Sequence, residues 1–405
     1  MVPNGWENKH LYELSTKISD GIHSTPKYVE SSGIYFVNGN NLKNGSIKIT
    51  EGTKNVCAEN AEKHWRDLTN RTILMSINGT IGNLAYYNGE NVVLGKSACY
   101  INVAECTDVD YIYYALKSSK TQSFYTSELT GSTIKNLSLK TIKSTKILTP
   151  PLPEQQKIAT ILGTWDKAIS ITERLIDNSK QQKKALMQQL LTGAHTQRKR
   201  LLDNSGKPFE GEWEEIEVGQ LTKIYDGTHS TPKYVEKGVP FYSVEHLTRN
   251  DFSRTKFISE DVFEKENKRV KLERNDILMT RIGDIGTAKC LTWDVQASFY
   301  VSLALFKSNV QFDSNYLTYY INSKEFHREL WKRTIHVAFP KKINLGEISH
   351  CFVKLPSLEE QQKIAATLTN SHKEIELLEQ QLADLKQEKK ALMQQLLTGK
   401  RRVLV

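Results

Sequence analysis

The chain has 405 residues, which is enough for two or three domains of ordinary size. Its 39% hydrophobic and 25% charged residues are typical of a folded globular protein and exclude a disordered one. No run of eighteen apolar residues is present, which excludes a membrane-spanning helix. The first residues lack a signal-peptide pattern, so we expect a cytoplasmic protein. The net charge of +9 is by itself weak support for a nucleic-acid partner.

The cysteines do not form a recognisable framework. They are odd in number, scattered and without a Cys-x-x-Cys motif: Cys57, Cys99, Cys106, Cys290 and Cys351. This set predicts reduced, mostly buried thiols rather than disulfides, and we expect no metal site.

Residues 1–150 and 213–356 are predicted to be mixed domains of short strands and helices. In the first domain β-type runs occur at 33–37, 71–76 and 98–103, and an amphipathic helical stretch at 108–125. In the second domain a β-type run lies at 299–306 and a helical stretch at 314–333. Because turn residues separate these elements, we predict an α+β fold for both domains.

Two segments of about 38 residues are predicted to be long helices, each roughly 57 Å long. In both, apolar or small residues recur in alternating steps of four and three, which indicates a heptad seam. The first seam consists of Ile158, Leu162, Trp165, Ile169, Thr172, Ile176, Ser179, Leu186 and Leu190, with Lys183 as an interruption. The second consists of Ile364, Leu368, Ser371, Ile375, Leu378, Leu382, Leu385, Leu392 and Leu396, with Lys389 at the matching position. Gly193 and Gly399 are expected to end the helices.

An internal repeat organises the whole chain. Residues 20–30 return as 226–236 with one change in eleven positions, and 183–193 return unchanged as 389–399, both at an offset of 206 residues. A period this long indicates a duplicated domain pair rather than a solenoid. Such pseudo-two-fold symmetry matches two-fold symmetric targets, duplex DNA above all.

The repeat predicts six consecutive segments. They are a first variable domain (1–150), a long helix (151–192), a linker (193–212) with the basic run 198–200, a second variable domain (213–356), a second long helix (357–399) and a basic tail (400–405).

Catalytic motifs are scarce. Residues 89–97 resemble a phosphate-binding loop but have five residues between the glycines where the motif has four. Dinucleotide, zinc-protease and serine-elbow motifs are absent from the sequence. His23 and His229 each stand beside Ser and Thr, yet a catalytic triad would also need a carboxylate and an oxyanion hole. We therefore expect a non-catalytic chain, while an enzyme using these loops stays open as an alternative.

The chain resembles the specificity subunits of type I restriction–modification systems. The resemblance covers the whole chain and is carried by the two-copy layout, the openings at Gly5-Trp6-Glu7 and at 211–214, the repeated Asp-Gly-x-His-Ser-Thr-Pro-Lys-Tyr loops, the Pro-Leu-Pro-Glu-Gln-Gln-Lys-Ile-Ala segment and the Leu-Met-Gln-Gln-Leu-Leu-Thr-Gly segments. It implies two target-recognition domains that each read half of a bipartite site in double-stranded DNA. It also implies an antiparallel coiled coil of the two helices that sets the spacer.

The resemblance further implies partners. Two methyltransferase (modification) subunits would hold S-adenosylmethionine, and restriction subunits that act as translocases would hold ATP and Mg²⁺. This chain itself would carry no cofactor and contact no membrane. A coiled-coil scaffold that binds only protein is the alternative.

Candidate base-reading residues lie where the two copies diverge. Short polar side chains and Arg suit base edges, and the candidates are Asn38, Asn40, Asn41, Asn78 and Thr80 in the first copy and Glu245, His246, Arg281 and Asp284 in the second. Arg281 could bind guanine through two hydrogen bonds. The alternatives are a solvated hairpin turn at 38–41 and 243–246, and a buried-sheet turn with one surface ion pair between Arg281 and Asp284 at 76–80 and 280–284.

Candidate phosphate-binding residues lie in the loops that the copies share, because phosphate contacts carry no sequence information. They are His23, Ser24, Thr25, Lys27 and Tyr28 in the first copy and His229, Ser230, Thr231, Lys233 and Tyr234 in the second, with Lys135, Lys341 and Lys342 as further candidates. The alternatives are a proline-fixed turn with packed His and Tyr, and a solvated charged face.

Overall fold

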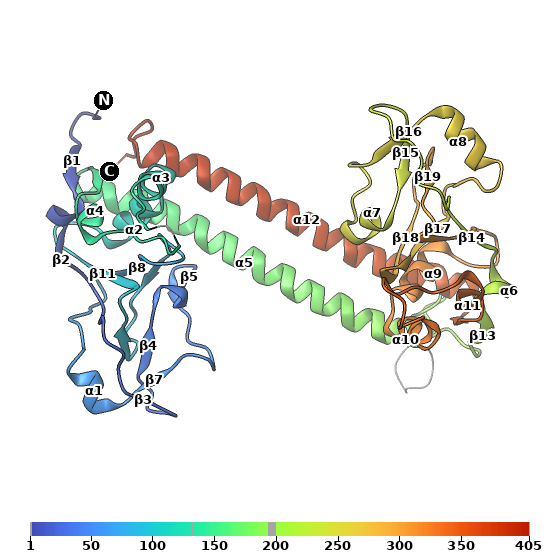
Figure 1. Cartoon of the computed structure of the whole chain (residues 1–405), viewed down its shortest axis with the longest axis horizontal. Helices are drawn as coiled ribbons and strands as arrows, with labels where there is room; N and C mark the ends of the chain where they lie inside the picture. The colour runs from blue at the N-terminus through green and yellow to red at the C-terminus, as the bar shows by residue number, and fades with distance from the viewer. Residues whose placement is uncertain (1, 132, 193–199, 405) are drawn as a thin grey trace. The chain divides into compact units, whose positions relative to one another are not determined.

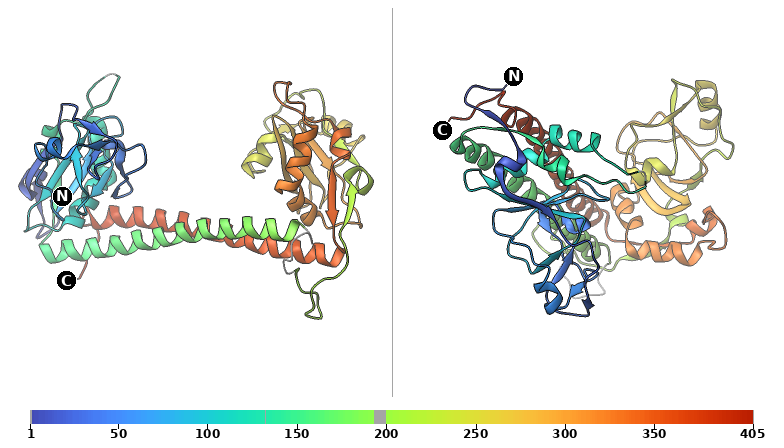
Figure 2. Two further views of the ribbon diagram at one scale, coloured as in Figure 1. Left: turned by 90° about the horizontal axis from the view of Figure 1, so that it is seen from below. Right: turned by 60° about the vertical axis from the view of Figure 1, so that its left-hand side comes forward.

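The computed structural model describes three stretches of the chain, residues 2–131, 133–192 and 200–404. The chain divides into two compact units, unit 1 (Met1–Glu173 with Gln380–Val405) and unit 2 (Arg174–Glu379). Each unit combines a globular part of strands and helices with segments of two long helices, α5 (Leu152–Leu191) and α12 (Leu358–Leu396) (Figures 1 and 2). The predicted α+β class with two long helices is confirmed.

A four-stranded antiparallel sheet forms the centre of unit 1, in the order β2-β11-β8-β9. These strands are β2 (Ser15–Asp20), β11 (Ala98–Val103), β8 (Thr72–Ser76) and β9 (Leu84–Tyr86). A separate antiparallel pair joins the beginning of the globular part to its end, namely β1 (Glu7–His10) with β12 (Lys146–Thr149). The chain therefore returns to its starting edge before α5 begins.

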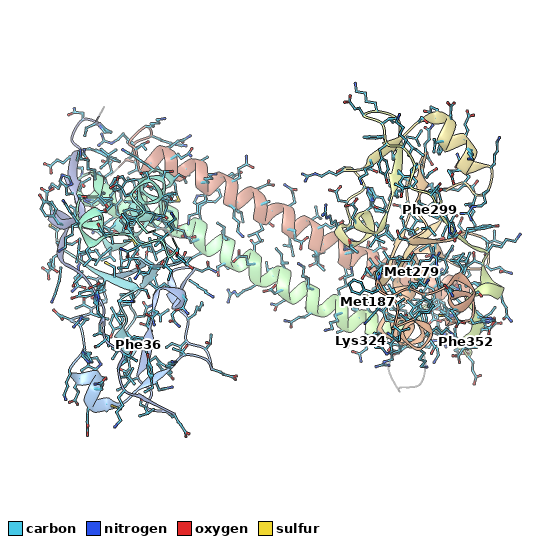
Figure 3. All side chains as sticks on the ribbon, viewed as in Figure 1. Phe36, Met187, Met279, Phe299, Lys324 and Phe352 are labelled. Atoms are coloured by element: carbon cyan, nitrogen blue, oxygen red, sulfur yellow. The ribbon has the colours of Figure 1, made fainter. Side chains whose placement is uncertain are left out.

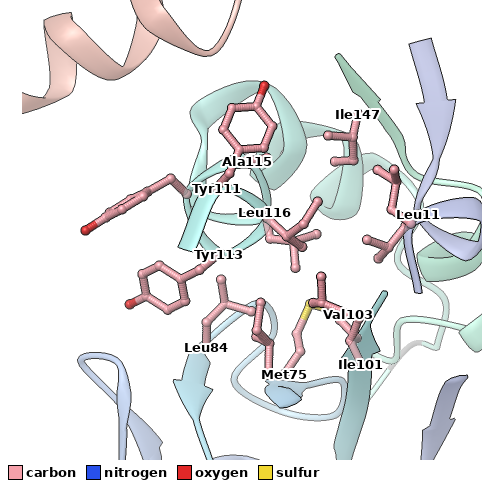
Figure 4. Close-up of a cluster of buried hydrophobic side chains, with 14 of the residues drawn as sticks. Leu11, Met75, Leu84, Ile101, Val103, Tyr111, Tyr113, Ala115, Leu116 and Ile147 are labelled. Carbon is pink, nitrogen blue, oxygen red and sulfur yellow. The ribbon is translucent and has the colours of Figure 1, made fainter. Parts of the chain in front are cut away.

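Both faces of this sheet are buried, which explains why its strands are continuous apolar runs. Successive side chains of a strand point to opposite faces, so Ile73 and Met75 join one hydrophobic cluster and Leu74 joins another. Figure 4 shows the first cluster, in which Leu116 of α2 (Val109–Lys117) lies above Met75 and Ile101. Burying each such side chain stabilises the fold by about 1.5–3 kcal/mol.

Smaller elements complete unit 1. A second sheet has the order β10-β4-β7-β3 and consists of β10 (Val92–Leu94), β4 (Tyr35–Val37), β7 (Asn55–Val56) and β3 (Tyr28–Val29). The remaining elements are η1 (Leu11–Leu14), η2 (Gly39–Asn41), β5 (Leu42–Lys43), β6 (Ser46–Ile47), α1 (Ala58–Glu62), α3 (Ser119–Ser127) and α4 (Leu139–Lys143).

Unit 2 repeats this plan. Its central sheet has the order β14-β20-β17-β18 and consists of β14 (Ile224–Asp226), β20 (Leu303–Phe306), β17 (Ile277–Ile282) and β18 (Asp284–Cys290). The closing pair is β13 (Glu214–Glu217) with β21 (Phe352–Leu355), and the second sheet is β16 (Lys256–Ile258), β15 (Val239–Tyr242) and β19 (Ser298–Phe299). The helices are α6 (Val218–Leu221), α7 (Val244–Arg249), α8 (Glu260–Asn267), α9 (Ser314–Ile321), α10 (Lys324–Arg333) and α11 (Leu345–Ser349).

Three predicted elements are interrupted. The run 299–306 contains two strands, β19 and β20, because Leu303 N donates to Tyr300 O in a turn between them at 2.9 Å. The helical stretch 108–125 is split at Ser118, which caps α3 with its side chain, and 314–333 is split before Ser323, which caps α10 in the same way. A side-chain oxygen that binds the next helix's backbone N–H begins a new helix at that point.

The long helices run antiparallel within each unit. In unit 1 Asp166 pairs with Lys389 at 2.5 Å and Glu173 with Lys386 at 2.7 Å, so the partner number falls as the α5 number rises. In unit 2 Lys180 pairs with Glu379 at 2.6 Å. Nearer the end of α5, Leu190 belongs to the same hydrophobic cluster as Met279 of the sheet. Met187 packs against this cluster (Figure 3).

Every predicted seam position of the two helices is buried or half-buried. By contrast, the apolar residues Ile171, Leu175 and Leu377 lie off the seam and are 49%, 47% and 72% exposed. The two seam lysines are half-buried or buried and lie over aromatic rings, Lys389 over Tyr114 at 5.0 Å and Lys183 over Tyr319 at 5.8 Å. Burial lowers the pKa of both lysines.

Arginines hold the beginning of each long helix. Arg402 donates to Glu154 of α5 at 2.6 and 2.7 Å, and Arg200 donates to Glu360 of α12 at 3.0 Å through Nε. The linker residues from 200 onward are therefore fixed to their unit. The predicted helix end at Gly193 and most of the basic run 198–200 lie outside the described residues.

The remaining sequence expectations concern thiols, metals and membranes. Cys99, Cys290 and Cys351 are buried, Cys57 is half-buried and Cys106 is exposed. Among the described residues there is no group of three or more His, Cys, Asp and Glu side chains that could hold a metal ion. None of the described helices has the length and apolar character that crossing a membrane requires.

Candidate nucleic-acid interface

The repeated loop is anchored in both units by its glycine. A Cβ on Gly21 would lie 2.0 Å from Leu94 O, and one on Gly227 would lie 2.0 Å from Phe299 O. No other residue fits this approach of two backbones. A short parallel bridge between Ile22 and Gly95 continues this contact in unit 1, and unit 2 has an equivalent bridge. The first half of the motif is thus required by packing.

An aspartate next to that glycine holds the histidine of the motif. Asp20 Oδ2 lies 2.9 Å from His23 Nε2, and Asp226 Oδ2 lies 2.9 Å from His229 Nε2. Arg269 Nη1 donates to Asp226 Oδ1 at 2.7 Å. Burial by itself would raise the pKa of Asp226, but hydrogen bonds from Arg269 and His229 outweigh it and lower that pKa. The carboxylate is therefore charged at neutral pH and fixes the imidazole.

The second half of the motif faces solvent. The side chains of His23 and His229 are 72% and 71% exposed. The Ser, Thr and Lys residues that follow in each loop are also exposed: Ser24, Thr25 and Lys27 in unit 1, and Ser230, Thr231 and Lys233 in unit 2. Pro26 is buried and fixes the turn between them. Packing therefore explains the Asp, Gly and Pro, whereas the exposed polar groups have the chemistry of phosphate ligands.

Two lysines that the sequence analysis missed belong to the same surface. Lys54 Nζ lies 4.5 Å from the ring centre of Tyr28, and Lys256 Nζ lies 4.6 Å from that of Tyr234. A cation over an aromatic face is held in place without losing its charge. A signal was present in the sequence, because Thr-Lys recurs at 53–54 and 255–256, where the matching strands β7 and β16 begin.

The divergent turns at 38–41 and 243–246 are equivalent in structure. Asn38 is the cap residue before η2 and Ser243 is the cap residue before α7, and in each turn the residue three positions later accepts a hydrogen bond from the backbone N–H of the cap. Asn41 Oδ1 accepts from Asn38 N at 3.0 Å, and His246 Nδ1 accepts from Ser243 N at 2.9 Å. Asn38 Oδ1 also accepts from Ser97 Oγ at 2.9 Å. The side chains of three predicted base readers, Asn38, Asn41 and His246, are therefore engaged inside their units, and His246 is only 2% exposed.

The same turns leave one polar side chain exposed in each unit. These are Asn40 in unit 1 and Glu245 in unit 2, and they occupy matching positions of the two turns. Asn presents the donor and acceptor that suit adenine, and Glu accepts from the amino group of cytosine. These two residues are the base-reading candidates that the geometry favours.

Arg281 requires a correction. Its side chain is only 9% exposed and lies inside unit 2, where Nε donates to Val301 O at 2.9 Å and Nη1 donates to Ile343 O at 3.0 Å. Nη2 lies 3.4 Å from Asp226 Oδ2. The alternative of a buried-sheet turn therefore describes this position, but its surface ion pair with Asp284 is wrong, since Asp284 accepts from Thr280 Oγ1 at 2.8 Å. Arg281 ties three loops together and has no exposed edge for guanine.

The remaining candidates gather around two equivalent hairpins. In unit 1 Asn78 pairs with Asn136, and Gly79 N donates to Lys135 O at 3.2 Å. In unit 2 Ile282 pairs with Lys342, and Gly283 N donates to Lys341 O at 2.8 Å. The side chains that remain exposed there are Thr80, Lys135, Asp284, Lys341 and Lys342. Each hairpin thus adds a basic edge beside the turn of the central sheet.

A groove lies where the globular part meets the helix pair in each unit. Its volume is about 920 Å³ in unit 1 and about 500 Å³ in unit 2. Matching positions line both, but Asp166 in unit 1 is replaced by His372 in unit 2. The Nε2 atom of His372 lies 3.3 Å from Oε1 of Glu376. Burial and the nearby charge of Lys183 lower the pKa of His372.

Comparisons with known proteins agree with the repeat. The family described as "Type I restriction modification DNA specificity domain" matches residues 3–180 and again 210–387. The type I restriction enzyme MjaVIII specificity subunit of Methanocaldococcus jannaschii is 28% identical, over 83% of this chain and 82% of that protein. The type I restriction enzyme MjaIX specificity subunit of the same organism is 24% identical, over 99% and 95%. The solved S subunit of a type I restriction-modification system from M. genitalium has the same fold, with a TM-score of 0.62 at 17% identity over 98% of this chain and 97% of that one.

Proposed function

Since this chain belongs to the family of type I restriction modification DNA specificity domains, its function is to supply DNA sequence specificity, and we propose that each unit reads one half of a bipartite site. One observation carries the proposal. Beside a loop that is nearly identical in both units and anchored in the same way, each unit exposes a different polar side chain, Asn40 or Glu245, at the same position. A shared anchor with a divergent reader is what two different half-sites require.

The shared loops are assigned to the phosphate backbone. Lys27 and Lys233 are exposed, and Lys54 and Lys256 are held over the tyrosines of the same loops. Because unit 2 has as many acidic as basic residues between 201 and 356, binding must depend on where its charges lie rather than on net charge. The lysines around the repeated loop and the hairpin provide such a local concentration.

The two long helices are assigned to spacing and docking. They are antiparallel in each unit and bury their seams against each other and the globular parts. The exposed apolar side chains of Ile171, Leu175 and Leu377 lie outside the seam, where they suit contact with a partner protein. The proposed partners are two methyltransferase subunits, with restriction subunits joining the assembly.

The chain is proposed to contribute no catalytic group. Among the described residues, neither His23 nor His229 has a serine or threonine hydroxyl within hydrogen-bond distance, and in both the aspartate binds Nε2. A triad base needs that hydroxyl contact. S-adenosylmethionine, ATP and Mg²⁺ are assigned to the partner subunits. A single-turnover assay of the purified chain should therefore show neither cleavage nor methyl transfer.

The proposal is tested by co-expression with the methyltransferase subunits of a type I system. Two such subunits per chain should co-purify, and the complex should retard duplexes that contain one bipartite sequence, identified by methylation-site mapping. A scaffold that binds only protein would co-purify and give no sequence-selective retardation. Co-purification without any preferred site would therefore overturn the proposal.

The spacing role is tested by lengthening both helices together, because each unit contains one segment of each. One heptad is inserted after Glu173 and one after Glu379, where unit 1 and unit 2 divide. Seven residues add about 10 Å and nearly preserve the seam. That length corresponds to about three base pairs of DNA. A longer spacer with unchanged half-sites supports the role, whereas an unchanged spacer contradicts it.

A further inference from the structure

The hairpin at 335–342 of unit 2 carries apolar side chains in full contact with solvent. Val337 is 97% exposed and Phe339 is 103% exposed, as much as in an extended chain. Phe339 therefore contributes nothing to the core, although burying a side chain of this size would stabilise the fold. Because Val337 and Phe339 expose neighbouring apolar side chains on one hairpin, the tip has the character of an interaction surface.

The base of the hairpin is firmly attached, so the tip is presented in a defined place. Lys342 pairs both with Ile335 across the hairpin and with Ile282 of β17. Arg281 donates to Ile343 O from inside the unit at 3.0 Å. On the outside, the ring of His336 lies 4.0 Å from that of Trp331, and Lys341 Nζ lies 5.1 Å from the same Trp ring.

The positive charge around the tip of the hairpin favours an anionic partner. Lys341 and Lys342 are exposed, and within the described part of the chain neither has an ion-pair partner. The acidic Glu329 nearby is occupied by Lys332 at 2.6 Å and Arg333 at 3.0 Å. An aromatic ring beside unpaired lysines suits a surface that is anionic outside and apolar within. Stacked base pairs between phosphate chains have this character.

We propose that Phe339 is an aromatic wedge that enters a base step of the DNA bound by unit 2, while Lys341 and Lys342 bind the flanking phosphates. The inference rests on the proposed DNA reading and adds a contact that unstacks the duplex. Unit 1 has a hairpin attached in the same way, in which Ile134 is 68% exposed beside Lys135. Because an aliphatic side chain stacks less well than a phenyl ring, we expect the stronger distortion at the half-site of unit 2.

The test uses the full chain in complex with its methyltransferase subunits and duplexes containing the mapped site. Each duplex carries 2-aminopurine at one position of the unit 2 half-site, outside the methylated adenine. With the wild-type chain its fluorescence should rise at one base step, because this base emits more strongly when unstacked. Phe339→Ala should return that signal to the level of the naked duplex and weaken binding about tenfold, as loss of one stacked aromatic predicts.

Two matched variants complete the design. Phe339→Trp should retain the fluorescence rise, and Val310→Ala, which alters another exposed apolar residue of unit 2 (90% exposed), should behave as wild type. If Phe339→Ala keeps the wild-type signal while site-selective binding persists, the wedge is wrong and the proposed function stands. If Phe339→Ala instead loses the methyltransferase subunits, the hairpin is a protein contact and the wedge is also wrong. A wild-type complex without any preferred site contradicts the proposed function itself.

Discussion

The two units have the same fold but differ in several residues at matching positions, and a comparison of these positions distinguishes structural residues from candidate DNA-binding residues. Both anchor the repeated loop with a glycine and hold its histidine with an aspartate. Yet where unit 2 buries Arg281, the matching residue of unit 1 is Ile77, which is only 4% exposed. The hydrogen bonds of a buried arginine in unit 2 are thus replaced by apolar packing in unit 1.

This replacement shows that divergence between the copies is not by itself a sign of DNA reading. Arg281 differs from its counterpart because the interior of unit 2 differs. Asn40 and Glu245 also differ between the units, but both are exposed in the same turn. Exposure combined with divergence, rather than divergence alone, identifies a reader. Three sets of substitutions test this distinction, and a fourth compares the response of the two units to pH.

The largest effect is expected for Arg281→Ala. The substitution removes the partner of two backbone carbonyls and one contact of Asp226. Unpaired buried groups are costly, so the free energy of unfolding of unit 2 should fall by about 3 kcal/mol. Denaturant unfolding measures it. The control is Arg274→Ala, a 61% exposed arginine paired at 3.8 Å, which should change stability by less than about 0.5 kcal/mol. Unchanged stability together with one degenerate base position would instead restore Arg281 as a reader.

The next effect is expected for the exposed pair. Asn40→Ala should relax one base position in one half-site and Glu245→Ala one position in the other, each at a cost of about 1–3 kcal/mol. Binding selection from randomised duplexes with the assembled complex measures both. Substitution of the exposed Thr248, on the same short helix as Glu245, is the control. Equal loss of affinity for all sequences would mean that these side chains position the DNA rather than read it.

A smaller and uniform effect is expected for the shared loops. Lys27→Ala should weaken binding to all sequences about equally and reduce the slope of log affinity against log salt by about one ion. Lys233→Ala should do the same through unit 2, because the loop is repeated. Salt titrations of the complex on specific and unrelated duplexes measure the slope. A change in sequence preference after either substitution would contradict the phosphate assignment.

The smallest effect is expected from pH, and it should distinguish the units. The pKa of His372 is lowered by burial and then by Lys183 and Lys289, with Glu376 and Glu379 acting in the opposite direction. Because the folded state disfavours the protonated imidazole, unit 2 should lose stability as pH falls below about 6.5, the ordinary histidine pKa. His372→Gln should remove this part of the pH dependence in denaturant titrations. Unit 1 has Asp166 at this position and should lack it. An identical pH dependence with and without His372 would disprove the assignment.

The sequence by itself determined the architecture. Heptad spacing is a local property of a helix, so the spacing of apolar residues alone identifies the seam positions of α5 and α12. The repeat at an offset of 206 residues likewise implied two equivalent units. The mixed α+β character followed from strand-like runs bounded by turn residues, although caps at Ser118 and Ser323 divided two helical stretches.

Only the tertiary structure decided which polar residues are available to a ligand. Asn38, Asn41, His246 and Arg281 have the chemistry of base readers, but a distant serine hydroxyl, local caps and a backbone carbonyl engage them. A repeated Thr-Lys pair is the only sequence signal for Lys54 and no motif marks Phe339, yet the fold places one over Tyr28 and the other at an exposed tip. The physical reason is clearest for Arg281, because a buried guanidinium must satisfy its N–H groups with whatever acceptors the fold brings near. Such an acceptor can be distant in sequence: Ile343 lies 62 residues beyond Arg281.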